Sequence, residues 1–93
     1  MAQKLTEEQI RASMKELKGW TRDGNEIERS LEFDGFTEAI DFINRIAELA
    51  DDADHHPEIF NVYNQVDLTL TTHDVGGLSQ KDFKLAQQIN AEV

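Results

Sequence analysis

The fold of this chain is decided by the stretch VDLTLTTH, which occupies residues 66–73. Val66, Leu68 and Leu70 are apolar and alternate with polar residues, as in a β-strand that has one face in the core and the other in water. A sheet with only one buried face needs helices to cover that face. The stretch therefore predicts an α+β protein in which helices pack on one face of a sheet.

The residues before this strand predict a partner strand and a long covering helix. Residues 60–63 form a second β-like run, and Asn64-Gln65 between the two runs indicates a hairpin turn. Further upstream, apolar residues recur at helical spacing from a start at Asp34 or Thr37 to about Ala53. The apolar stripe of this helix must cover a sheet or another helix.

The N-terminal third contains another predicted helix, which is followed by another predicted hairpin. Thr6 and Gln9 have the spacing of a capping box, which predicts a helix that runs to about Lys18. Two β-like runs follow, residues 20–22 and 26–33, and the Asp-Gly-Asn between them is a hairpin-turn signal. We therefore expect an antiparallel pair of strands after the first helix.

The residues after the central strand predict the last helix. Gly76-Gly77 breaks the strand, and Ser79 begins a helix with Asp82 at its third position, which is a second capping-box pattern. The elements therefore follow the order α-β-β-α-β-β-α. That order predicts a single domain over residues 1–93, with a four-stranded antiparallel sheet and its helices packed on one face.

The composition excludes several classes of protein. The chain has 19 acidic and 9 basic residues and a net charge of −10, so we expect no direct contact with nucleic acid. It has no cysteine, which excludes disulfides, iron–sulfur clusters and thiolate zinc sites. No stretch approaches a membrane span, and residues 1–5 lack the apolar run of a signal peptide, so we expect a cytoplasmic protein without membrane contact.

The three histidines lie in two regions whose sequence is unusual for its predicted secondary structure. His55 and His56 follow Asp51, Asp52 and Asp54 at the C-terminal end of the predicted long helix, where the helix dipole disfavours negative charge. Neighbouring carboxylates favour the imidazolium form of histidine, which is the form that a general acid needs. The alternative is a solvated acidic turn that carries two surface histidines.

The third histidine, His73, lies at the end of the central strand, where strand alternation predicts that it shares the polar side with Asp67. If residues 60–72 form a hairpin, its two outer ends are adjacent. The hairpin then brings His55 and His56 close to His73, and the three residues form one candidate site. The alternative is that His73 is an exposed residue at a strand end.

Two other kinds of site fit the pattern less well. Three imidazoles and a carboxylate could serve zinc, but the adjacent His55 and His56 tend to point in different directions and no HxH or HxxxH pair exists, so we expect no metal. A Ser-His-Asp triad with Ser79 or Thr72 lacks the glycine pattern of a nucleophile elbow. Asp82 can be a capping-box acid, a catalytic or substrate-binding acid, or both.

Two runs of the chain resemble the signature of the pterin-4a-carbinolamine dehydratase family. They are DHHPEIFNVYN at residues 54–64 and VDLTLTTH at residues 66–73, followed by Gly77-Leu78-Ser79 and Asp82. Gly19-Trp20 and the order of elements also fit the family, so the resemblance covers nearly all of the chain. His-His-Pro followed by Phe-Asn-Val-Tyr-Asn is a highly specific combination.

The resemblance implies a reaction that needs neither a cofactor nor a metal. The family dehydrates 4a-hydroxytetrahydropterin to quinonoid dihydropterin and so recycles the product of aromatic amino-acid hydroxylases. His55 and His73 match its general acids, and His56 matches a residue implied in substrate binding and base catalysis. Asp82 matches the family's acid near the start of the last helix. The implied substrate-binding residues are Asp51, which stands where many members have glutamate, and His55, His56, Pro57, Thr72, His73, Asp74 and Val75.

The resemblance also raises alternatives to this function. Ile59 stands where many relatives have a tryptophan that could cover the pocket mouth, which leaves room for a different pterin-related role. Animal members also serve as dimerisation cofactors of a transcription factor through a helix, but Ala12 and Met14 among charged neighbours form no convincing apolar patch. A one-sided sheet leaves an unused surface, so we expect a homodimer or homotetramer formed through sheet edges or the last helix.

Overall fold

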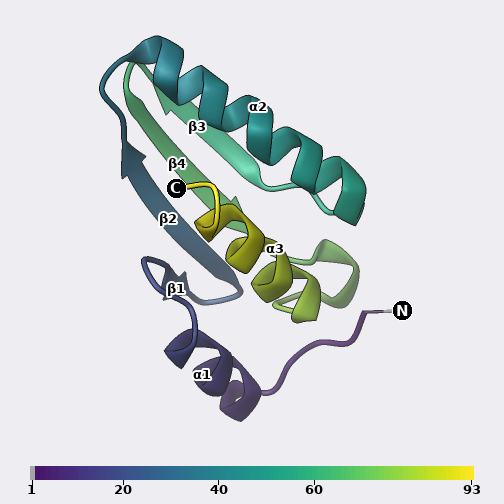
Figure 1. Cartoon of the computed structure of the whole chain (residues 1–93). Helices are drawn as coiled ribbons and strands as arrows, with labels where there is room; N and C mark the ends of the chain where they lie inside the picture. The colour runs from purple at the N-terminus through teal and green to yellow at the C-terminus, as the bar shows by residue number, and fades with distance from the viewer. Residues whose placement is uncertain (1) are drawn as a thin grey trace.

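The computed structural model describes residues 2–93 and confirms the predicted order of elements, α-β-β-α-β-β-α (Figure 1). The elements are α1 (Glu7–Lys15), β1 (Thr21–Asp23), β2 (Glu26–Glu32), α2 (Phe36–Ala53), β3 (Glu58–Val62), β4 (Gln65–Leu70), the short 3-10 helix η1 (His73–Val75) and α3 (Gln80–Asn90). No helix among residues 2–93 is long and apolar enough to cross a membrane.

The four strands form one antiparallel sheet in the order β1-β2-β4-β3. The alternation in β4 is confirmed, because Val66, Leu68 and Leu70 are buried while Asp67 and Thr69 between them are only half-buried. α2 and α3 pack against each other over the buried face and complete the core with their apolar stripes (Figure 1). The predicted fold, a four-stranded antiparallel sheet with helices on one face, is confirmed.

Hydrogen bonds join the start of the first helix, α1, to the rest of the molecule. Thr6 forms the predicted capping box at its start, and the backbone N–H of Leu5 donates to the carbonyl of Leu78. Arg22 on β1 donates two hydrogen bonds of 2.7 Å to the Glu7 carboxylate. These hydrogen bonds lower the pKa of Glu7.

Some predicted helix boundaries were wrong by a short distance. α1 ends before Lys18, because Leu17 fills the core from the turn that follows the helix and not from the helix itself. The apolar side chain of Leu17 continues the helical spacing in the sequence, so the pattern predicted a longer helix than the one that forms. α2 begins after Gly35, whose backbone caps the helix without a side-chain hydrogen bond, and not at Asp34 or Thr37.

The turn between β3 and β4 lies one position earlier than predicted, at Tyr63-Asn64 and not at Asn64-Gln65. Tyr63 has a left-handed φ of 49°, which is uncommon for a residue other than glycine. The turn is held by Asn64, whose amide nitrogen Nδ2 donates to the carbonyl of Phe33 at 3.0 Å, while the Phe33 N–H donates to the Asn64 carbonyl at 2.8 Å. The register of the hairpin is therefore fixed from β2 as well as from its own strands.

Candidate active site

The chain leaves α2 through a left-handed residue that precedes the first two histidines. Asp54 has φ 48° and ψ 42°, and its N–H donates back to carbonyls in the last turn of the helix. The His55 N–H also donates to the carbonyl of Ala50 at 3.1 Å. Aspartate and asparagine adopt this conformation more readily than other residues with a side chain. Asp54 therefore ends α2 and places His55 and His56 in the short connection to β3.

The third histidine lies in a loop that follows β4. Because β4 ends at Leu70, His73 begins η1, and the prediction of its side from strand alternation does not apply. A backbone bridge between Thr72 and Gly77 closes the loop, with hydrogen bonds of 2.9 and 3.4 Å. Gly76 ends η1 with φ 69°, a left-handed conformation that favours glycine. The bridge fixes the loop that carries His73.

The structure brings the three histidines together around one open hollow of about 200 Å³. Its lining residues are Asp54, His55, His56, Thr71, Thr72, His73, Asp74 and Lys81. Of the residues predicted for the site, Asp51, Pro57, Val75 and Asp82 do not line the hollow. Ile59 does not line it either, so its side chain does not cover the mouth of this hollow.

Asp82 is completely buried and is in contact with His55. Its Oδ1 lies 2.6 Å from Nε2 of His55, whose side chain is only 11% exposed. Its Oδ2 accepts hydrogen bonds from the Thr72 hydroxyl at 2.8 Å and from the Ser79 N–H at 2.9 Å. Ser79 is the N-cap of α3, so the predicted capping box is confirmed. The same carboxylate thus caps a helix and holds a histidine.

The other two histidines are held less firmly. Nε2 of His56 lies 2.9 Å from Oδ1 of Asp51, in a pair whose side chains are 58% and 78% exposed. His73 is also exposed, and its imidazole makes no hydrogen bond to another residue in the range 2–93. Asp51 therefore contacts the site through His56. Within the described chain, His55 alone among the three histidines has a buried partner.

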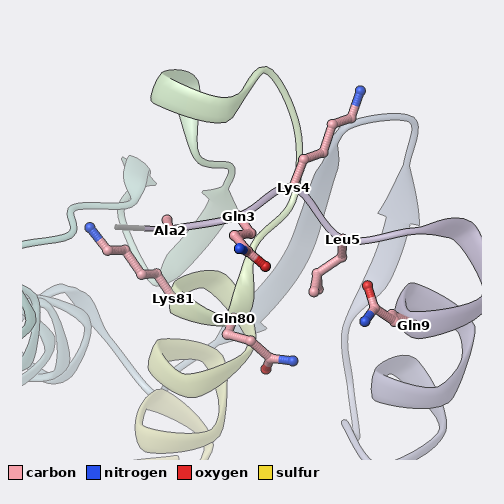
Figure 2. Close-up of a pocket in the computed structure, with 7 residues that line it drawn as sticks. All are labelled: Ala2, Gln3, Lys4, Leu5, Gln9, Gln80 and Lys81. Carbon is pink, nitrogen blue, oxygen red and sulfur yellow. The ribbon is translucent and has the colours of Figure 1, made fainter.

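Lys81 lines the hollow and was not predicted from the sequence, and Asp54 and Thr71 line it although neither was predicted to bind or react. It belongs to the first turn of α3, directly before Asp82, and this position was the signal that could have identified it. Lys81 also lines a larger hollow of about 590 Å³ between the N-terminal segment and the start of α3 (Figure 2). The residues that line this larger hollow include no histidine and no carboxylate, so acid–base chemistry points to the smaller one.

Groups that could hold a metal lie elsewhere. Among residues 2–93, the acids or histidines whose ligand atoms come close enough to share an ion are Asp23, Glu26 and Glu28, on β1 and β2. The histidines of the hollow are not in this group. Their ring nitrogens and the neighbouring carboxylates therefore do not converge on one point.

The sequence is similar to known proteins over nearly its whole length. A family model described as pterin 4 alpha carbinolamine dehydratase matches residues 3–92. A protein of Picosynechococcus sp. with the name "Putative pterin-4-alpha-carbinolamine dehydratase" is 50% identical over 86 residues, which cover 92% of this chain and 94% of that protein. A protein of the same name from Sulfurisphaera tokodaii is 44% identical over 87 residues, which cover 94% of each chain.

Solved structures share the fold. The structure of a transcriptional coactivator/pterin dehydratase from Brucella melitensis matches with a TM-score of 0.92 and 40% identity, over 96% of this chain and 97% of that one. A pterin dehydratase-like protein that is a RuBisCO assembly factor in the α-carboxysome matches with a TM-score of 0.64 and 18% identity, over 78% of this chain and 84% of that one, and shares the fold alone. The family model and the relatives that match almost end to end place this chain in the pterin 4 alpha carbinolamine dehydratase family.

Proposed function

We propose that this chain dehydrates 4a-hydroxytetrahydropterin to quinonoid dihydropterin. The observation that carries the proposal is the hollow in which His55, His56 and His73 meet, in a chain that matches the dehydratase family almost from end to end. The physiological role that follows is recycling of the pterin cofactor of aromatic amino-acid hydroxylases in the cytoplasm.

The proposed reaction moves protons and no electrons between molecules. The bond between C4a and the hydroxyl oxygen breaks as a general acid delivers a proton to that oxygen, and the products are water and the pterin. The N5 lone pair forms the C4a–N5 double bond, and the N5 proton is lost to a base or to water. The net change is the loss of one water molecule, so the reaction needs a positioned acid and no redox cofactor.

The residues of the hollow have separate roles in this proposal. His55 and His73 donate the proton, each to one of the two faces of the pterin, and His56 binds the substrate and serves base catalysis. Backbone groups of residues 72–75 hold the edge of the ring, and Asp51 contributes through its contact with His56, while Pro57 follows His56 directly. Asp82 has no exposed surface, so it acts through His55 and not by contact with the pterin.

An assay with substrate generated in situ tests the proposed function. Adding the protein to 4a-hydroxytetrahydropterin should accelerate the appearance of quinonoid dihydropterin, followed by absorbance. Dialysis against a strong chelator should leave the rate unchanged, because the histidines and acids of the hollow form no shared ligand set. A rate equal to the uncatalysed one contradicts the proposed function, and a rate that collapses after dialysis and returns with zinc contradicts the metal-free mechanism.

A further inference from the structure

The buried carboxylate of Asp82 forms every contact that an ionised group needs inside a protein. A buried charge is costly unless hydrogen bonds satisfy it. Its Oδ2 accepts two such bonds, from the Thr72 hydroxyl and the Ser79 N–H, and its Oδ1 lies 2.6 Å from Nε2 of His55. No buried side-chain nitrogen or oxygen among residues 2–93 lacks a hydrogen-bond partner. The network is therefore complete with the carboxylate ionised.

The direction of the hydrogen bonds follows from counting protons. An ionised carboxylate only accepts, so the single hydroxyl proton of Thr72 is used in its 2.8 Å bond to Asp82. The Thr72 and Ser79 hydroxyl oxygens lie 2.7 Å apart, and this second bond must then run from Ser79 to Thr72. The Ser79 oxygen in turn accepts from the N–H of Lys81 at 3.2 Å. The two hydroxyls form a directed chain that ends on the carboxylate.

The same counting assigns the protons of His55. If Asp82 is ionised, Nε2 of His55, which lies 2.6 Å from Oδ1, must carry a hydrogen in order to donate to it. The neutral imidazole then has its lone pair on Nδ1, and the second proton of the imidazolium form sits on Nδ1. Proteins usually select a histidine tautomer by placing a hydrogen-bond partner at one of the two ring nitrogens.

We propose that Ser79 and Thr72 are positioning residues: their hydroxyls hold Asp82 so that it binds Nε2 of His55 and leaves Nδ1 to exchange the catalytic proton. The assignment of a catalytic proton rests on the proposed dehydratase function, whereas the tautomer does not. His56 differs in this respect, because its Nε2 faces the exposed Asp51 and no buried hydroxyl supports that pair.

The tautomer can be measured without substrate by nitrogen NMR of the histidine rings. In the native protein, neutral His55 should carry hydrogen on Nε2 and none on Nδ1. Thr72→Val removes the hydroxyl, and Ser79→Ala removes the proton that points to Thr72, so both should give a mixture of tautomers at His55. Thr72→Ser keeps the hydroxyl and should restore the native tautomer. The His56 signals serve as an internal reference.

Kinetics and matched controls separate positioning from a loss of folding stability. Thr72→Val and Ser79→Ala should lower kcat by about tenfold, a loss typical of residues that support a reacting group from behind, with little change in KM. Thr69→Val on β4 and Thr6→Ala, which removes the same kind of cap from α1, should keep native kcat and the native tautomer.

Two outcomes overturn the proposal. The first is a native His55 whose neutral ring carries its hydrogen on Nδ1. The second is a Thr72→Val or Ser79→Ala protein that is folded by circular dichroism and keeps both the native tautomer and native kcat. If instead the native protein shows the expected tautomer but no dehydratase activity, the positioning network stands and the proposed function fails.

Discussion

At the scale of single residues, the three imidazoles around the hollow differ in what surrounds them. His55 is nearly buried and bound to a buried carboxylate, while His56 and His73 are open to solvent. Orientation of a proton donor within hydrogen-bond reach is a main requirement of general acid catalysis. We therefore expect substitutions at the three positions to have different kinetic effects.

Replacing His55 or His73 by alanine should lower kcat by roughly 10²–10⁴-fold, the range that general acid catalysis usually contributes. The losses should differ between the two stereoisomers of the 4a-carbinolamine, because in the proposed mechanism each histidine serves mainly one of them. His56→Ala should raise KM more than it lowers kcat. Steady-state rates with each stereoisomer measure all three effects.

The double variant His55→Ala with His73→Ala is the sharpest form of this test, and it should approach the uncatalysed rate. Lys84→Ala on the exposed side of α3 is a matched control, because Lys84 does not line the hollow. If the double variant folds by circular dichroism and keeps near-native turnover, these histidines do not donate the catalytic proton and the mechanism is wrong.

Part of the site could be predicted from local sequence and part could not. The spacing of Ser79 and Asp82 revealed the capping box, and the hairpin was enough to bring His73 near the other two histidines. The contact between His55 and Asp82 joins residues from opposite sides of the hairpin, so no local pattern contains it. The place of Lys81 was missed for the same reason, because it depends on how α3 packs beside α2.

At the scale of elements, hydrophobic periodicity predicted which helices and strands form, but not where each one ends. The misplaced boundaries lie at residues whose type suggests one backbone conformation while the folded chain adopts another. Leu17 keeps the apolar spacing of α1 from a position outside the helix, and Tyr63 occupies a left-handed position that a sequence would normally give to glycine or asparagine. Burial in the core decides the position of Leu17, whereas hydrogen bonds between Asn64 and Phe33 hold the turn at Tyr63.

The Asn90 amide links the end of α3 to neighbouring segments. We expect Asn90→Ala to destabilise the protein by about 1–3 kcal/mol, the cost of leaving the buried indole N–H of Trp20 without a partner. Asn90 Oδ1 accepts from Trp20 Nε1 at 2.8 Å and from Arg29 Nη1 at 2.6 Å, and its Nδ2 donates to the Lys18 carbonyl at 2.9 Å. Urea denaturation followed by circular dichroism measures the change. Asn44→Ala on the exposed face of α2 is the control, with an expected change within about 0.5 kcal/mol.

An Asn90→Ala protein with native stability would show that the amide is dispensable and that apolar packing alone holds the helix end. A loss of the proposed dehydratase activity out of proportion to the loss of stability is not expected, because Asn90 does not line the hollow.

At the scale of the whole molecule, the helices lie on the apolar face of the sheet. The alternation of apolar and polar residues over residues 66–71 was enough to predict this arrangement. The surface that remains could not be predicted in detail. β3 forms one edge of the sheet, and its residues Phe60 and Val62 are large, apolar and exposed. Nothing in the alternation of β4 indicates that the edge strand beside it carries such residues.

The exposed edge leads us to expect self-association through β3, as a dimer or tetramer. Unpaired edge strands with apolar side chains commonly pair with another chain. Sedimentation at micromolar concentration should show no major monomer, and Val62→Lys should shift the protein toward the monomer. Thr21→Lys on β1, at the opposite edge, should leave the assembly unchanged. A native protein that sediments as a clean monomer of 10.6 kDa contradicts this expectation.

The burial of Trp20 against the end of α3 also gives the molecule an internal optical probe. The chain has one tryptophan and one tyrosine, so each emission comes from a single place. Trp20 is 5% exposed and reports whether α3 is docked, whereas Tyr63 is 63% exposed at the tip of the β3–β4 hairpin and reports whether that edge is covered. Neither ring lines the histidine hollow. Fluorescence can therefore follow unfolding and self-association as two separate signals, in the native sequence and without an added dye.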